Sequence, residues 1–245
     1  DVSLDGLRSI ALDVGFYHND FNKLFQYYLG INYLSNQNSY MSNLGFNEIF
    51  NIDLRKLYGV GNDNYSLYAG LDRYARFIKS NVKINTSVGI NSYQNTINDL
   101  DIRENVSYYN MSSLKVKTGF FGVVNFENYL QYNYTAFQTN DSDWLGFSSL
   151  HNSFKTYIYP RKHVFFNIDL RYYVPDLSKK QDFMFIDTSI TFSSKNQKME
   201  YSLISKNVSA KKNEFTHINY SDYYTGSSSY NLMKPYLLFS MRFRF

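Results

Sequence analysis

The last stretch of the chain reads Pro235-Tyr236-Leu237-Leu238-Phe239-Ser240-Met241-Arg242-Phe243-Arg244-Phe245 and alternates with a period of two. Successive side chains of a β-strand point to opposite faces, so the pattern predicts a strand with two unlike faces. The apolar face would carry Leu237, Phe239, Met241, Phe243 and Phe245, and the other would carry Arg242 and Arg244. An exposed apolar edge strand invites aggregation. Closure of a barrel in a membrane removes that edge, whereas the last edge of a soluble β-sandwich is the alternative.

The composition is rich in aromatic residues, yet the chain is hydrophilic on average. Aromatic residues make up 19% of the 245-residue chain, with 25 Tyr and 21 Phe against one Trp. The mean hydropathy is nonetheless negative, as expected where apolar residues alternate with polar ones. No stretch approaches the about 20 consecutive apolar residues of a transmembrane helix, which excludes a helical membrane protein.

Two further features of the composition exclude classes of site and partner. The chain has no cysteine, so it has no disulfide framework and no thiolate metal ligand. Its net charge of +4 is spread along the chain rather than gathered in a basic tract, so we expect no nucleic-acid partner.

Alternation of this kind runs through the whole chain and predicts about twelve antiparallel strands. Residues 164–172 give the clearest one, and we interpret 100–121 as a single long strand because its apolar parity is unbroken. Tight turns are predicted at 36–39, 78–81, 160–162 and 194–198, and longer polar connections at 55–64, 139–146 and 209–231.

Strand length and loop length together favour a membrane. The strands are about 11 to 14 residues long, which suits a tilted crossing of a bilayer. Strands of soluble proteins are commonly about five or six residues long. Short turns alternate with long connections, as in outer-membrane barrels. We therefore predict an all-β, antiparallel transmembrane β-barrel in the outer membrane, with residues 1–245 in a single domain; a soluble sandwich or propeller remains the alternative.

Several segments near the C-terminus resemble one family. They are 185–190 (Phe-Ile-Asp-Thr-Ser-Ile), 201–203 (Tyr-Ser-Leu), 206–208 (Lys-Asn-Val), 220–223 (Tyr-Ser-Asp-Tyr), 230–232 (Tyr-Asn-Leu) and the terminal strand. Together they are similar to the C-terminal barrel region of TonB-dependent outer-membrane receptors of the Bacteroidota type, which are Gram-negative bacteria. Asn207-Val208 stands where that family usually has Asn-Leu, and Lys234-Pro235 where an arginine is common.

The resemblance implies a barrel of about 22 strands with a plugged lumen. Because about twelve strands are predicted, the chain would form about half of such a barrel; the alternative is a smaller barrel that closes by itself on an even strand count. The resemblance also implies partners: outer-membrane lipid, a plug domain, an energy-coupling protein and a surface lipoprotein. The terminal Phe245 resembles the signal that the outer-membrane insertion machinery recognises.

Charged residues recur on the face of the strands that would line the lumen. The candidates for this face are Asp72, Lys83, Arg103, Asp169, Arg171, Asp187, Arg242 and Arg244. They would contact a plug, a substrate or a water column. Alternatively, they pair with one another across neighbouring strands, for which Asp169, Arg171 and Asp187 are the best candidates.

The sequence offers no pattern for bond chemistry. His18, His151, His163 and His217 are scattered, and none belongs to a His-Glu-x-x-His motif. No glycine-rich phosphate loop or dense carboxylate cluster is present, so we expect no catalytic residue, cofactor or metal. A Ser-His-Asp site remains open, since triads are spatial rather than sequential.

These observations lead to two hypotheses on function. The first is a TonB-dependent receptor-like transporter that mediates substrate uptake across the outer membrane without bond chemistry. The second is a non-catalytic barrel subunit that scaffolds an outer-membrane assembly or secretion complex.

Overall fold

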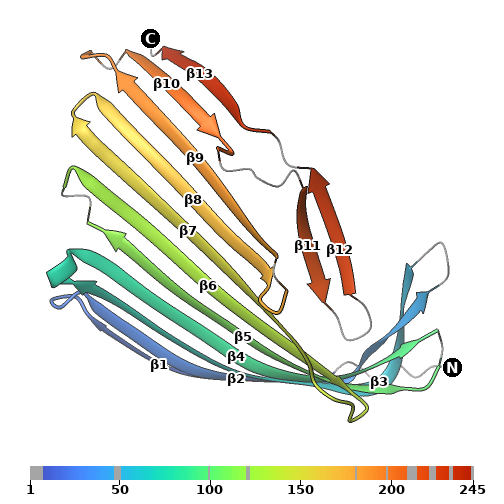
Figure 1. The fold of residues 1–245 in the computed structure, drawn as a ribbon. Coiled ribbons are helices and arrows are strands. Elements are labelled where there is room, and N and C mark those ends of the chain that lie inside the picture. Colours follow the sequence, from blue (N-terminus) through green and yellow to red (C-terminus); the bar gives the residue numbers. More distant parts are fainter. Residues whose placement is uncertain are drawn as a thin grey trace.

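The computed structural model of the chain is all-β (Figure 1). It describes residues 8–46, 51–98, 100–119, 122–179, 181–196, 198–208, 214–220, 225–231 and 234–243. Of 38–46 and 51–59, and of some residues in the last hairpin, it describes the backbone alone. No helix in this part of the chain is long and apolar enough to cross a membrane.

Eleven strands form one antiparallel sheet in the order β1 to β10 followed by β13, and β11 pairs with β12 in a separate hairpin. A single turn of 3₁₀-helix, η1 (Arg76–Ile78), joins β3 to β4. The strands are β1 (Arg8–Asp20), β2 (Phe25–Phe46), β3 (Asn51–Ala75), β4 (Ser80–Ile97), β5 (Arg103–Thr118), β6 (Val124–Thr139), β7 (Leu145–Arg161), β8 (Val164–Asp176), β9 (Gln181–Ser193), β10 (Met199–Lys206), β11 (Glu214–Tyr220), β12 (Thr225–Asn231) and β13 (Tyr236–Phe243).

The large sheet is curved and open, with β1 along one edge and β13 along the other (Figure 1). All neighbours in the order β1 to β13 are antiparallel, and the sheet has an odd number of strands, so β1 and β13 run in the same direction. The pairing of first and last strands that the smaller, self-closing barrel would need is absent from the described strands. Antiparallel closure of this sheet would take an odd number of additional strands.

The prediction of one long strand over 100–121 is confirmed by β5, which is continuous from Arg103 to Thr118. Its middle is polar, but every residue there is paired with β4 and with β6. Backbone pairing on both sides satisfies the N–H and C=O groups whatever the side chains are. The polar middle is for this reason no break.

The predicted turn at 36–39 and the predicted connection at 55–64 are wrong. Both lie inside the long hairpin of β2 and β3, and two register shifts occur between Asn36 and Tyr40. A β-bulge absorbs the extra residues where a turn was expected. The turn between β1 and β2 lies at 21–24, where the carboxylate of Asp20 accepts the backbone N–H groups of Asn22 and Lys23, both at 3.1 Å.

The predicted loop over 209–231 contains the hairpin of β11 and β12, so this expectation is also wrong in part. The strand β12 is rich in Ser, and neither strand of the hairpin carries a regular apolar alternation, which is why the pattern did not indicate them. The large sheet has eleven strands rather than about twelve, because the three strands expected over 23–74 form only two, β2 and β3.

Cross-linking can test the two edges, because the chain has no native cysteine. Ser202 and Ser240 lie opposite each other on β10 and β13, so we expect S202C/S240C to be joined by a short bis-maleimide. The pair A11C/S240C, with Ala11 on the far edge strand β1, should stay unlinked. Intramolecular cross-linking of A11C/S240C, detected by mass spectrometry, would contradict the arrangement of the edges.

Candidate functional site: the polar face of the sheet

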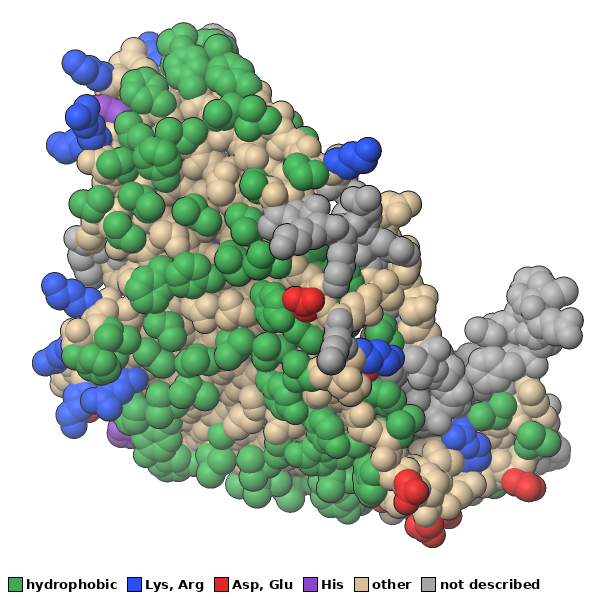
Figure 2. Space-filling view, viewed as in Figure 1, with side chains coloured by type: hydrophobic (Ala, Val, Ile, Leu, Met, Phe, Trp, Pro, Cys, Tyr) green, Lys and Arg blue, Asp and Glu red, His purple; other side chains and the backbone are tan. Residues whose placement is uncertain are grey.

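The sheet has one apolar and one polar face. Residues opposite each other on neighbouring strands point to the same side, so the register of the ladders assigns every described side chain to a face. Phe239, for example, lies opposite Leu203, which lies opposite Ile190. On β8 the apolar face carries Val164, Phe166, Ile168, Leu170 and Tyr172. Figure 2 shows such hydrophobic side chains in rows along the strands.

The apolar face is open to its surroundings from one edge of the sheet to the other. Ile10 on β1 is 56% exposed, Ile31 on β2 is 58% exposed and Phe239 on β13 is 63% exposed. The only other sheet among the described residues is the two-stranded hairpin of β11 and β12. No second layer of the described chain therefore covers this face.

The opposite face is polar and carries both charges. Seven of the eight charged residues expected on a lumen face lie here, and Arg244 falls outside the described residues. Asp72 lies opposite Lys83, and Arg103 donates to Thr139 Oγ1 at 3.2 Å. Whether this face borders a lumen stays a prediction. The seven are Asp72, Lys83, Arg103, Asp169, Arg171, Asp187 and Arg242.

The residues expected to close the barrel lie on the apolar face of β13. Leu237, Phe239, Met241 and Phe243 are all exposed there, while Phe245 falls outside the described residues. Among the described strands β13 has one neighbour, β10. The free edge of β13 is therefore available for pairing.

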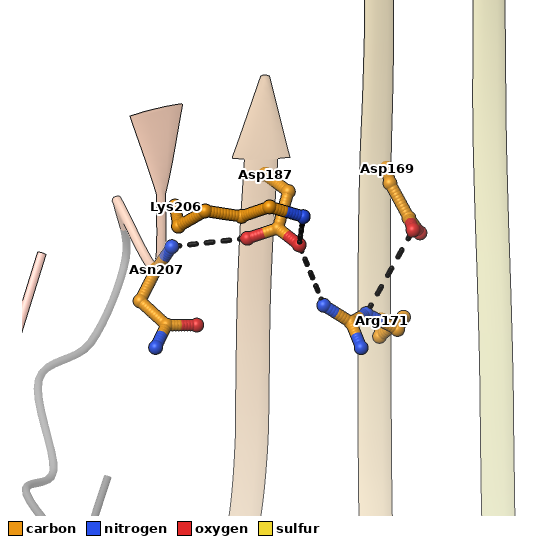
Figure 3. A network of polar contacts seen from close by, with 5 residues as sticks. All are labelled: Asp169, Arg171, Asp187, Lys206 and Asn207. Carbon is orange, nitrogen blue, oxygen red and sulfur yellow. Dashed lines mark hydrogen bonds and ion pairs between the residues drawn. The ribbon is translucent and has the colours of Figure 1, made fainter. Parts of the chain in front are cut away.

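A charged network joins three strands on the polar face, around the buried carboxylate of Asp187 (Figure 3). Asp187 Oδ2 accepts hydrogen bonds from Arg171 Nη2 at 2.7 Å and from Lys206 Nζ at 2.9 Å. Asp187 Oδ1 accepts the backbone N–H of Asn207 at 3.0 Å. One carboxylate on β9 thus holds side chains of β8 and β10 and the backbone just after β10.

The contact with Asn207 fixes where the chain leaves the sheet. Asn207 has a φ of 55°, in the left-handed region that Asn tolerates better than most residues. The next N–H, of Val208, donates to the carbonyl of Ile186 at 2.9 Å. Asp187 therefore clamps the end of β10 onto β9.

Asp169 interacts with Arg171 more weakly than the sequence analysis predicted. Its Oδ2 lies 3.9 Å from Arg171 Nε, which is too long for a hydrogen bond. Its Oδ1 is buried and has no hydrogen-bond partner among the described residues. The guanidinium of Arg171 instead lies over the ring of Phe185, at 5.9 Å from the centroid.

Glu127 on β6 forms a second charged ladder that the sequence did not single out. Its carboxylate lies 2.9 Å from Lys115 Nζ and 3.7 Å from Lys117 Nζ, both on β5. The period-two pattern places Glu127 on the same face as its partners, but the register needed to pair them comes from the fold. Charges on this face thus pair locally, as the alternative interpretation expected for some of them.

Tyrosines lie flat across glycines on the polar face of β1 to β5. Tyr68 crosses Gly30 and donates to Asp13 Oδ1 at 3.0 Å, two strands away. Reciprocally, Tyr28 crosses Gly70 and donates to Asn85 Oδ1 at 3.0 Å.

The glycines are required by this close approach. A Cβ on Gly30 would lie 2.2 Å from the ring of Tyr68, and one on Gly70 would lie 2.3 Å from the ring of Tyr28. A glycine inside a strand pattern indicates such an approach, but the sequence does not say which ring occupies the space.

The histidines do not gather. His18 lies on the apolar face of β1, and His151 lies on the polar face of β7 between Tyr129 and Tyr173. His163 belongs to the turn before β8, and His217 belongs to β11. No three His, Asp or Glu side chains in the described part of the chain are placed to hold a metal ion.

No protein-family model matches the chain, and no curated protein is significantly similar to it.

The clamp formed by Asp187 can be tested by substitution. Asp187→Asn keeps the shape but removes the charge that Arg171 and Lys206 share, so we expect the free energy of unfolding to fall by about 2 kcal/mol. Asp169→Asn is the matched control, since Asp169 approaches Arg171 only at 3.9 Å, and should cost less than about 0.5 kcal/mol. Urea titration measures both; equal losses would contradict the central position of Asp187.

The Tyr68–Gly30 contact gives a second test. Gly30→Ala pushes the ring of Tyr68 away and breaks its bond to Asp13, so we expect a loss of about 2 kcal/mol in the free energy of unfolding. Gly61→Ala, where nothing lies within 4 Å of the added Cβ, should leave stability unchanged or slightly raised. A similar response of the two variants would show that the contact contributes little.

Proposed function

We propose that the chain forms the wall of a membrane-spanning β-barrel that serves transport across the outer membrane. The observation that carries the proposal is the sheet's pair of unlike faces: a continuous exposed apolar face backed by a polar, charged one. A soluble protein rarely exposes a contiguous apolar patch larger than a few hundred Å². Lipid is the solvent that suits this face.

Strand length supports the same environment. A 13-residue strand such as β8 is about 43 Å long and, tilted by about 40°, rises about 33 Å. The apolar band of an outer-membrane barrel is about 25 Å tall. The strand spans that band with residues left at both ends.

A soluble sandwich is less favourable for a physical reason. It would need a second sheet to cover the apolar face, with side chains interdigitating about 10 Å away. The described chain puts eleven strands into a single layer. The hairpin of β11 and β12 is too small to cover that layer.

The polar face suits an aqueous lumen. Its cations are partly exposed even where they bind a buried carboxylate, as in the network around Asp187, where the side chains of Arg171 and Lys206 are 43% and 41% exposed. Such side chains contact water, a plug or a substrate without a prohibitive desolvation cost. Uptake by a TonB-dependent mechanism rests on the resemblance of the C-terminal segments, and it involves no bond chemistry.

Insertion of matched arginine variants into vesicles tests the membrane face. Ile190 lies on the apolar face of β9 and its neighbour Ser189 lies on the polar face. We expect Ile190→Arg to make folding into phosphatidylcholine vesicles less favourable by about 2–4 kcal/mol, because the charge enters lipid. Ser189→Arg should change it by less than about 1 kcal/mol.

Quenching by a lipid-borne quencher provides an independent readout. With a fluorophore attached at I190C or at S189C, we expect quenching by a lipid-borne quencher at position 190 alone. Folding of the wild-type chain without vesicles, or equal costs for the two arginine variants, would overturn the proposal.

A further inference from the structure

The short turns make a basic rim at one end of the sheet. Four of the five connections at this end, at 21–24, 76–79, 162–163 and 194–198, carry Lys or Arg. Arg73 and Arg161 add cations at strand positions next to these turns. Figure 2 shows Lys and Arg side chains along this edge, at the left of the view. The short-turn rim is defined by eight exposed residues: Lys23, Arg73, Arg76, Lys79, Arg161, Lys162, Lys195 and Lys198.

Acidic residues do not neutralise the rim. Among the described residues one of the eight cations has an ion pair, Lys23 with Asp20 at 3.4 Å. Among the described residues, the connections at the opposite end of the sheet carry Asp101, Asp141 and Asp143 together with Lys179 and Lys234. The two ends of the sheet therefore differ in charge.

Large apolar side chains are exposed on the connections at this end of the sheet. Phe21 is 77% exposed, Phe77 is 89% exposed and Val123 is 57% exposed. Leu24 and Ile78 are exposed beside them. Apolar and cationic side chains are thus interspersed along the rim, at the ends of the strands.

We propose that the short-turn rim binds the anionic headgroups of the phospholipid leaflet that surrounds the end of the sheet. The inference rests on the proposed function, because it needs the apolar face in lipid. It adds a ligand chemistry, the phosphate of an anionic lipid, and a side of the membrane on which this chemistry acts.

Two physical arguments favour this ligand. Lys and Arg lay their aliphatic stems along apolar surface and carry the charge to the headgroup level. The exposed side chains of Phe21 and Phe77 would enter the leaflet beside these cations, because their exposure to water is unfavourable. Each cation near an anionic surface then strengthens binding about fivefold.

The experiment measures the equilibrium constant for folding into vesicles by urea titration, followed by the fluorescence of Trp144, the one tryptophan. Vesicles of pure phosphatidylcholine are compared with vesicles that contain one part phosphatidylglycerol to one part phosphatidylcholine. We expect the wild-type chain to fold into both and to favour the anionic vesicles. The preference should shrink in high salt, which screens exposed charges.

Matched double variants locate the effect. Lys79→Gln with Lys162→Gln removes two rim cations, and we expect the preference for anionic vesicles to fall about 25-fold, fivefold for each cation. Lys179→Gln with Lys234→Gln removes two exposed cations at the other end of the sheet and should change the preference less than about threefold. Folding into pure phosphatidylcholine should be unchanged in the rim variant. The control variant also loses the Lys179–Asp176 ion pair at 3.5 Å, and this loss cancels in the ratio between the two kinds of vesicle.

The outcomes separate the two proposals. Failure of the wild-type chain to fold into either kind of vesicle would overturn the membrane proposal, and the rim with it. Folding into both without a preference, or equal losses in the two double variants, would overturn the rim alone. Restoration of the preference by Lys79→Arg with Lys162→Arg would support a role for charge rather than for lysine itself.

Discussion

The structure depends on a single constraint: the two-residue period of the side chains must be carried without error across every ladder of the sheet. A slip of one residue in any strand would turn its apolar residues to the polar side. The register shifts within these antiparallel ladders lie near strand ends or in the long hairpin, between Asn36 and Tyr40, between Ile158 and Arg161, and between Tyr173 and Asp176. The apolar face is consequently continuous from β1 to β13.

The polar face stabilises the same register from the other side. Asp187 binds side chains of β8 and β10 at once, so a shift of either strand would separate charges that are now 2.7–2.9 Å apart. Tyr28 and Tyr68 act in a similar way on the same face, nearer the edge formed by β1, since each ring fits only over the glycine opposite it. Specific polar contacts and apolar alternation therefore select the same pairing.

The two ends of the sheet are as unlike as its two faces. One end carries short turns with exposed phenylalanines and exposed cations, and the other carries longer connections with more acidic residues and the extended hairpin of β2 and β3. A protein in a membrane meets two different surroundings in the same way: its wall contacts the lipid tails, and its ends contact the headgroups and water. The apolar face in lipid and the short-turn rim at the headgroups are parts of one proposal about how the molecule is oriented in the membrane.

The sequence by itself determined the fold class, because alternation is a local property: side chains two apart share a face whatever the strand pairs with. The continuity of 103–118, the apolar side of β13 and the face of Asp187 follow from parity alone. Hairpin boundaries did not follow, since polar residues such as Asn36 are found both in turns and in paired strands with a bulge. Only the tertiary structure decided which residues meet. Register brings Lys206 and Asn207 to Asp187 and Tyr68 to Gly30, and the order of the strands leaves β1 and β13 parallel at opposite edges.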